Sequence, residues 1–505
     1  NSKGSCFLPY PEPLVFDSWD NKINSLLYSK VHTYGIGHGT SVEWGDSKED
    51  SVNYISSTFL PEYEMHSLKH KSNEDLDLNM IKFSDLDWEE DSYERMFGLI
   101  SNYDNWIKII EEEIKDIDDK VLKEQAINNL DQCMQCSERI REGIDLLRDH
   151  EDVLYAFKLM NRVMLDQQLR YAMDDIMWYE DKASGSLVID NRELPNLNDP
   201  STWPDWDGES TKFGKWRIFQ LAFILMNLKG IVDSDSSERE LVDLLWFPTG
   251  GGKTEAYLGL AAFSILYGRI IKRRTRSVDV IMRYTLRLLT AQQFNRASAM
   301  IICCDQLRKE MPDKLGSDEI SIGIFVGRSL TPNKRNDALR LLERLQENTR
   351  KQDYQFVLLR CPSCGKQMGP VDQTFKGIHE HERSVRFKCY GNCQYSDEYL
   401  PIYVIDEDIY DKTPSLIIGT VDKFALLPFI INMRSLFGVD VPEVGTHSPP
   451  TLIIQDELHL ISGPLGSMVG HYEGVFHQLM TKNGSVPKII TSTATIAMAR
   501  EQIRD

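Results

Sequence analysis

From about residue 213 onwards, short apolar runs alternate with longer stretches of helical character. The apolar runs span residues 241–247, 278–282, 320–326, 416–418, 452–454 and 489–490. Helical stretches such as Glu255–Leu266 and Leu286–Cys304 separate some of these runs. Continuous apolar strands that alternate with helices are typical of a parallel sheet with helices on both faces. The pattern therefore predicts a doubly wound α/β fold for this part of the chain.

The hydrophobic pattern is different in the first two hundred residues. Residues 1–85 show no clear period, whereas from about residue 86 the apolar positions take helical spacing, as in Ile107, Ile110 and Ile114. A segment rich in Pro, Gly and Asn follows, and that composition favours turns. We therefore predict an irregular acidic region over 1–85, a helical domain over 86–182, a linker over 183–210 and an α/β domain over 211–505.

The negative charge of the chain is concentrated in its first part. The 505 residues carry a net charge of −20, and residues 1–200 hold 41 acidic against 20 basic side chains. An acidic surface repels phosphate, so this region by itself is a poor nucleic-acid surface. It could bind a basic partner or cover a basic groove, but we favour a solvated acidic face. No apolar run reaches the ~18 residues of a membrane span, so no membrane partner is expected.

A glycine-rich loop lies between a predicted strand and a predicted helix, with the sequence Phe-Pro-Thr-Gly-Gly-Gly-Lys-Thr at residues 247–254. Consecutive glycines let backbone N–H groups approach phosphate oxygens, and the helix N-terminus adds a positive dipole end. Lys253 suits the β- and γ-phosphates of ATP, and the hydroxyl of Thr254 suits Mg²⁺. The loop predicts an ATP site made by Thr249, Gly250, Gly251, Gly252, Lys253 and Thr254.

An acidic pair, Asp456 and Glu457, ends a later apolar run about 200 residues downstream. Phosphoryl transfer needs a carboxylate beside Mg²⁺, a role that suits Asp456 at a strand end. It also needs a group that activates the attacking water, and Glu457 suits that role as general base. An Asp-Glu pair alone is common, but its combination with the glycine-rich loop indicates ATP hydrolysis with Lys253, Asp456 and Glu457 as catalytic residues. His459, two residues further on, could couple nucleotide state to the rest of the domain.

Two pairs of cysteines, Cys361 with Cys364 and Cys389 with Cys393, flank 24 residues. Two paired thiolates on two turns are typical of a tetrahedral zinc ribbon, so we predict a structural Zn²⁺ within an insertion over residues 345–405. Four cysteine ligands leave no open position, so the site implies no catalysis. The odd total of nine cysteines argues against a secreted disulfide framework, and we expect a reducing, cytoplasmic location.

Two of these segments, Thr249–Thr254 and Asp456–His459, together with a later one, Ser492–Thr495, resemble motifs I, II and III of superfamily 2 helicases of the Asp-Glu-x-His branch. The resemblance implies a RecA-like P-loop lobe in which His459, Ser492, Thr493 and Thr495 couple ATP hydrolysis to strand movement. Helicases commonly relax the position that Phe247 occupies. Gln220 resembles the glutamine that reads adenine, although a lone glutamine before a helix is as often a surface residue.

Longer runs, at residues 247–261, 283–293, 419–424 and 455–466, resemble the DrmA family, the helicase-like subunit of bacterial DISARM antiphage systems. In that family the segments after two strands grip the sugar–phosphate backbone, a contact that does not depend on base. The resemblance assigns this role to Arg283, Thr285, Arg287, Thr420, Asp422 and Lys423. The alternative for each residue is a charge satisfied locally.

The resemblance implies a cytoplasmic, ATP-dependent DNA helicase or translocase motor that works with other subunits of a DISARM-type complex. The alternatives are a nucleotide-gated DNA-binding scaffold without unwinding, and an RNA helicase, since RNA is not excluded by the motifs. We expect a second RecA-like lobe on a continuation or another segment, because no further motif follows Thr495. The second lobe would carry the arginine finger, which contributes about 10³–10⁵ in rate. Residues 1–505 alone should therefore bind ATP but hydrolyse it slowly.

Overall fold

The computed structural model describes most of the chain. The described residues are 7–10, 19–29, 31–45, 51–59, 76–171, 178–181, 186–189, 214–247, 250–272, 274–347, 354–371, 374–391, 393–439, 448–481 and 486–494. The chain divides into two compact units, one of residues 1–71 with 101–138 and the other of residues 72–100 with 139–505. Helices α2 (Asp91–Lys115) and α3 (Lys120–Asp149) contribute residues to both units. The predicted domain boundaries stay predictions, and most of the predicted linker lies outside the described residues.

The first unit contains short elements that the sequence pattern did not predict. They are α1 (Trp19–Leu27) and an antiparallel hairpin of β1 (Ser41–Trp44) and β2 (Ile55–Thr58). The unit also includes the facing parts of α2 and α3. There Ile107 and Ile114 are buried together with residues of α3, and Ile110 packs against them. The predicted helical stripe thus forms a small apolar core.

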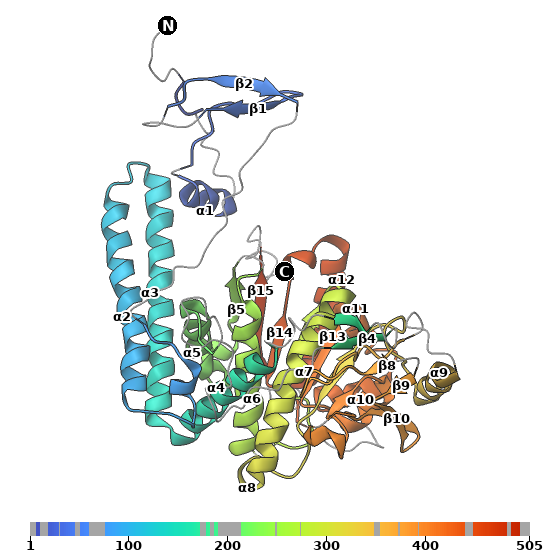
Figure 1. Ribbon diagram of the computed structural model, residues 1–505. Helices are drawn as coiled ribbons and strands as arrows, with labels where there is room; N and C mark the ends of the chain where they lie inside the picture. Colours follow the sequence, from blue (N-terminus) through green and yellow to red (C-terminus); the bar gives the residue numbers. More distant parts are fainter. Residues whose placement is uncertain are drawn as a thin grey trace. The chain divides into compact units, whose positions relative to one another are not determined.

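Seven parallel strands form the centre of the second unit (Figure 1). In spatial order they are β12 (Ile402–Tyr403), β7 (Ile322–Phe325), β13 (Leu416–Thr420), β6 (Val280–Tyr284), β14 (Leu452–Gln455), β15 (Lys488–Thr493) and β5 (Val242–Trp246). Each of the six predicted strands is present, and the predicted α/β fold with a parallel sheet is confirmed. The pattern missed β12, because a two-residue strand leaves no period to detect.

The strand order brings distant segments to one edge of the sheet. Strand β15 lies between β5 and β14 and pairs with both in parallel. The loop that follows β5 and the acidic pair that follows β14 therefore emerge at the same edge, since parallel strands have their carboxyl ends together. This edge is where open parallel sheets bind ligands.

Helices cover the sheet. The longer ones of the second unit are α4 (Glu151–Tyr171), α5 (Ile218–Val232), α6 (Lys253–Ile270), α7 (Arg287–Glu310), α9 (Arg335–Glu347) and α12 (Gly463–Thr481), and the shorter ones are α8 (Pro312–Leu315), α10 (Asp406–Lys412) and α11 (Val421–Phe424). Short 3-10 turns are η1 (Met80–Phe83), η4 (Ser237–Arg239), η6 (Gln394–Ser396), η7 (Ile431–Phe437) and η8 (Leu458–Leu460). Helix α6 contacts α4, α5, α7 and the sheet, which explains why it is apolar on nearly all sides.

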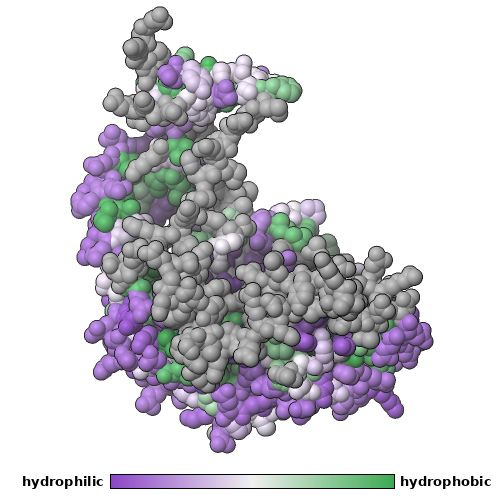
Figure 2. Space-filling view, in the orientation of Figure 1, coloured by the Kyte–Doolittle hydropathy of each residue, from purple (hydrophilic) through white to green (hydrophobic). Residues whose placement is uncertain are grey.

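Small antiparallel hairpins complete the unit: β3 (Trp178–Asp181) with β4 (Ser186–Ile189), β8 (Gly369–Val371) with β9 (Thr374–Lys376), and β10 (Ile378–His381) with β11 (Ser384–Phe387). The surface differs from helix to helix. Helix α9 turns charged side chains outwards, whereas a small hydrophobic patch lies over α12, where Leu465 and Met468 are exposed (Figure 2). Among the described helices, none has the length and apolar character needed to cross a membrane.

Candidate functional site

A cavity of about 450 Å³ opens beside the sheet. Its lining includes the three glycines of the loop after β5, followed by Lys253 and Thr254, and it also includes Asp456 and Glu457 after β14. The structure thus brings the predicted phosphate loop and the predicted acidic pair into one cavity. Its volume lies within the range of small-ligand sites.

The loop has the backbone conformation that glycine permits. Gly250 has φ +76° and Gly252 has φ +86°, and a Cβ atom at Gly252 would lie 2.8 Å from the Nε2 atom of Gln220. Helix α6 begins at Lys253, so its free N–H groups and positive dipole end are at the loop. The Nζ atom of Lys253 donates a hydrogen bond of 2.9 Å to the carbonyl oxygen of Phe247. Thr249, predicted as part of the loop, lies outside the described residues.

A chain of hydroxyl groups links the loop to Asp456. The Thr254 Oγ1 atom lies 3.1 Å from the Tyr257 hydroxyl, which donates a 2.7 Å hydrogen bond to Asp456 Oδ2. The other carboxylate oxygen, Oδ1, accepts from the Ser492 hydroxyl and from the Glu457 N–H. Burial raises the pKa of Tyr257 well above its usual value, so its hydroxyl stays protonated and can donate.

Tyr257 is a site residue that the sequence reasoning missed. It follows Thr254 by three positions on α6, so the two side chains share one face of the helix. The sequence shows that spacing, but it does not indicate a role for the tyrosine, because the contact with Asp456 arises only in the folded chain. The threonine hydroxyl and the carboxylate are hard oxygen donors of the type that Mg²⁺ prefers, so the residues present fit a magnesium ion.

Glu457 and His459 connect the acidic pair to β15. Glu457 has φ +52°, a left-handed conformation that costs of order 1–3 kcal/mol for a residue other than glycine and is common at functional sites. Its Oε2 atom lies 3.3 Å from His459 Nδ1, within ion-pair distance but without a hydrogen bond. His459 Nδ1 is also 3.0 Å from Thr493 Oγ1. The predicted coupling residues His459, Ser492 and Thr493 therefore all contact the acidic pair or one another, whereas Thr495 lies outside the described residues.

Gln220, the residue predicted to read adenine, uses its side-chain amide in hydrogen bonds to the backbone of this chain. Its Nε2 atom donates to the carbonyl oxygen of Gly252 at 2.7 Å, and its Oε1 atom accepts from the Arg217 N–H at 2.8 Å. The Arg217 guanidinium also donates to the carbonyl oxygen of Gly251. Both side chains belong to the start of α5, and their hydrogen bonds hold the phosphate loop in place.

The predicted nucleic-acid residues at the end of β6 and just after it differ in accessibility. Arg283 is 4% exposed and forms an ion pair with Glu473 of α12. Thr285 is half-buried, and Arg287 begins α7 with a side chain outside the described part. The charge of Arg283 is thus paired within the protein in this structure, and its contact with a nucleic-acid backbone stays a prediction.

The predicted residues at the end of β13 and just after it are likewise mostly buried. Lys423 is 4% exposed, and its Nζ atom lies 2.6 Å from Asp406 Oδ2 and 3.2 Å from Asn333 Oδ1. Thr420 is fully buried, and Asp422 is exposed. Contact of these residues with a nucleic-acid backbone stays a prediction.

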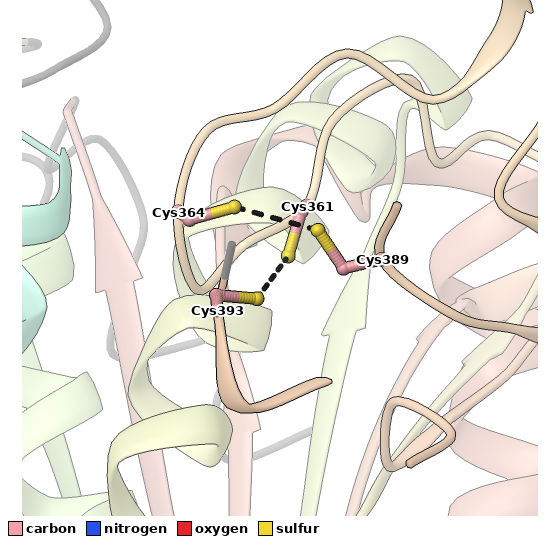
Figure 3. A group of neighbouring side chains, drawn as sticks. All are labelled: Cys361, Cys364, Cys389 and Cys393. Atoms are coloured by element: carbon pink, nitrogen blue, oxygen red, sulfur yellow. Dashed lines mark hydrogen bonds between the residues drawn. The ribbon is translucent and has the colours of Figure 1, made fainter. Parts of the chain in front are cut away.

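The four predicted cysteines form a single cluster (Figure 3). All four sulfur atoms lie within 4.8 Å of one another, with 4.0 Å between Cys361 and Cys393 and 3.5 Å between Cys364 and Cys389. Four sulfurs placed tetrahedrally at ~2.3 Å from one zinc ion are about 3.8 Å apart. The thiol set therefore fits a tetrahedral metal ion, and it is the one such cluster found among the described residues.

The cysteine cluster is attached to the helices that cover the sheet. The Arg170 guanidinium, at the end of α4, donates to the carbonyl oxygen of Ser363 at 2.6 Å and to its hydroxyl at 3.0 Å. It also donates to Gln306 of α7 at 2.8 Å and pairs with Asp166. One partly buried arginine thus joins two helices to the turn that carries Cys361 and Cys364.

Comparisons with known proteins agree with the motifs. No family model matches the chain. The "DISARM protein DrmA" of Bacillus paralicheniformis is 33% identical over an alignment of 539 residues, which covers 96% of this chain but 45% of that protein, so the chain spans less than half of this relative. A crystal structure titled DUF1998 helicase MrfA matches 56% of this chain and 30% of its own chain, at 16% identity and a TM-score of 0.27, which is a weak likeness. The chain is therefore related to DrmA along almost its whole length, which confirms the resemblance that its motif-containing segments indicate.

Proposed function

We propose that this chain forms the ATP-binding part of a DNA helicase or translocase subunit that acts with other subunits of a DISARM-type defence complex. One observation carries the proposal: Lys253 and Thr254 share a cavity with Asp456 and Glu457, and Tyr257 bonds the two segments together. The relation to DrmA supports the defence role and the presence of partner subunits.

The side chains of the cavity divide the work of phosphoryl transfer. Loop N–H groups and Lys253 hold the β- and γ-phosphates, and Thr254 with Asp456 would hold Mg²⁺, which neutralises phosphate charge when bound. Glu457 accepts a proton from the attacking water. His459 contacts both Glu457 and Thr493, so a change at the carboxylate can reach β15.

We expect ATP hydrolysis by the full-length protein to increase when DNA is added, because a motor couples its chemistry to the strand it grips. Steady-state hydrolysis with no nucleic acid, with DNA and with RNA of matched sequence measures this directly. Equal rates in all three conditions would contradict a motor. A larger response to RNA would favour the RNA helicase, and DNA binding without ATP-dependent strand separation would favour the scaffold.

We also propose that the four-cysteine cluster holds a structural zinc ion. The four thiolates would fill its coordination shell, so its contribution is to fold and stability rather than to catalysis. The ion would then stabilise the turns that Arg170 joins to α4 and α7.

Replacement of Arg170 by Met should loosen this attachment. The change removes two hydrogen bonds to Ser363 and leaves buried partners unpaired, which costs on the order of 3 kcal/mol. We expect zinc transfer to a chromophoric chelator to become several-fold faster and the melting temperature to fall. Arg141→Met, at an exposed position of α3, is the control. Equal zinc release from both variants would show that Arg170 does not support the cluster.

A further inference from the structure

We propose that Gln167 of α4, outside all the helicase motifs, accepts a hydrogen bond from the 6-amino group of the adenine base and so selects the nucleotide. This inference rests on the proposed nucleotide-binding function and names a specificity residue for the same cavity. It assigns to the helix preceding the α/β domain a part in substrate recognition that the motifs do not include.

The residue expected to read the base is already engaged. Gln220 uses its amide oxygen to accept from Arg217 and its amide nitrogen to donate to Gly252, at 2.8 Å and 2.7 Å. These bonds hold the phosphate loop in place, and breaking them to bind a base would release the loop. Gln220 is therefore a positioning residue in this arrangement.

The amide oxygen of Gln167, unlike that of Gln220, has no hydrogen-bond partner among the described residues. Gln167 lines the cavity and is 1% exposed. A buried amide oxygen without a partner is unfavourable and uncommon. Because Gln167 belongs to the lining of the cavity, a ligand that binds there can supply the missing donor.

Contacts of α4 place Gln167 near the segment that leads into Gln220. The adjacent Gln168 accepts from the Gly214 N–H at 2.7 Å, and Asn161, two turns earlier, accepts from the Trp216 indole N–H at 2.6 Å. Gln168, Lys215 and Arg217 line the cavity together with Gln167. This wall is therefore continuous with the start of α5.

The chemistry of an acceptor narrows the ligand group. Ionised phosphates carry no donors, so the Oε1 atom of Gln167 cannot accept a hydrogen bond from the triphosphate. The donors of ATP are the ribose hydroxyls and the 6-amino group of adenine, whereas guanine and hypoxanthine carry an acceptor at position 6. A buried acceptor that bonds to the 6-amino group of adenine would favour ATP. With GTP the same acceptor would face the O6 atom of guanine, and neither oxygen would have a donor.

A second glutamine provides an internal comparison. Gln293 of α7 lines the same cavity and also has an Oε1 atom without a partner among the described residues. It lies one turn before Arg296, which pairs with Glu255 in the first turn of α6. Gln293 thus lies on a different part of the lining, on α7 beside the first turn of α6, and the test below distinguishes it from Gln167.

The test is calorimetric titration of the full-length protein with magnesium complexes of ATP, GTP and purine riboside triphosphate, which lacks the 6-amino group. We expect the wild type to bind ATP roughly tenfold more tightly than purine riboside triphosphate, and Gln167→Met to remove that difference. Gln293→Met should leave it intact, and Gln292→Met, at an exposed position, is the matched control. Thermal unfolding shows that each variant is folded.

The outcomes separate this inference from the proposed function. If the wild type binds no nucleoside triphosphate, the proposed function and this inference both fail. If it binds ATP and purine riboside triphosphate equally, or if Gln293→Met rather than Gln167→Met removes the difference, the base-reading role is overturned while nucleotide binding stands. If Gln167→Met weakens both nucleotides alike but leaves 2′-deoxyATP binding unchanged, Gln167 contacts the ribose and the inference is wrong. If Gln167→Met does not fold, equal binding of ATP and purine riboside triphosphate by the wild type still overturns the inference.

Discussion

Replacement of Lys253 by Ala should abolish detectable ATP hydrolysis by weakening nucleotide binding. The Nζ atom lies across the phosphate loop, 2.9 Å from the Phe247 carbonyl oxygen, and is mostly buried within the cavity wall. Loss of a charged group that contacts the transferred phosphate in such a site costs about 10²–10³ in rate. Magnesium-ATP titration and a coupled hydrolysis assay measure the two effects.

Replacement of Glu457 by Gln should separate hydrolysis from binding. The amide keeps the size of the side chain but cannot take a proton, so we expect a loss of about 10²–10⁴ in rate. ATP affinity should remain close to that of the wild type.

The control for the Lys253→Ala variant is Lys334→Ala, which removes a lysine at an exposed position. If hydrolysis survives in both Lys253→Ala and Glu457→Gln, this cavity is not the catalytic site.

Loss of one thiol from the cysteine cluster should have the largest effect on stability. Cys361 is fully buried and lies 4.0 Å from the sulfur of Cys393. Cys361→Ser should therefore remove the bound zinc and, with it, much of the metal-linked folding free energy, which reaches about 10–16 kcal/mol in small zinc domains. We expect one zinc per wild-type chain by atomic absorption, none in the variant, and a lower melting temperature.

Two further variants make the zinc prediction specific. Cys133→Ser changes a half-buried thiol of α3 outside the cluster and should keep both zinc and stability. Cys393→His retains a zinc ligand and should keep part of the metal. A wild-type protein that contains no zinc and is indifferent to chelators would exclude a metal role for the cluster.

The predicted nucleic-acid residues show that a local motif does not reveal the ion pairs that its side chains form in the folded chain. Arg283, near the end of β6, and Lys423, just after β13, lie where the helicase resemblance predicts backbone contacts, but here they pair with Glu473 and Asp406. Neither partner lies close in sequence to the residue that it pairs with. Such pairs become visible only when the strands are assembled, because an ion pair depends on distance in space.

The sequence alone was sufficient where chemistry depends on short spacing. Strand, loop and helix around Gly250–Thr254 are consecutive, and the paired cysteines sit on local turns, so their patterns predict phosphate and zinc binding directly. Buried parallel strands are apolar throughout, so the α/β fold was also readable.

Only the tertiary structure decided which side chains meet at the cavity. The insertion of β15 between β5 and β14 brings Tyr257 to Asp456, and the packing of α4 on α6 and α7 brings Gln167 to the same cavity. The same assembly ties Gln220 to the loop. These relations join residues far apart in the chain, and each depends on strand order and helix packing, which no local spacing encodes.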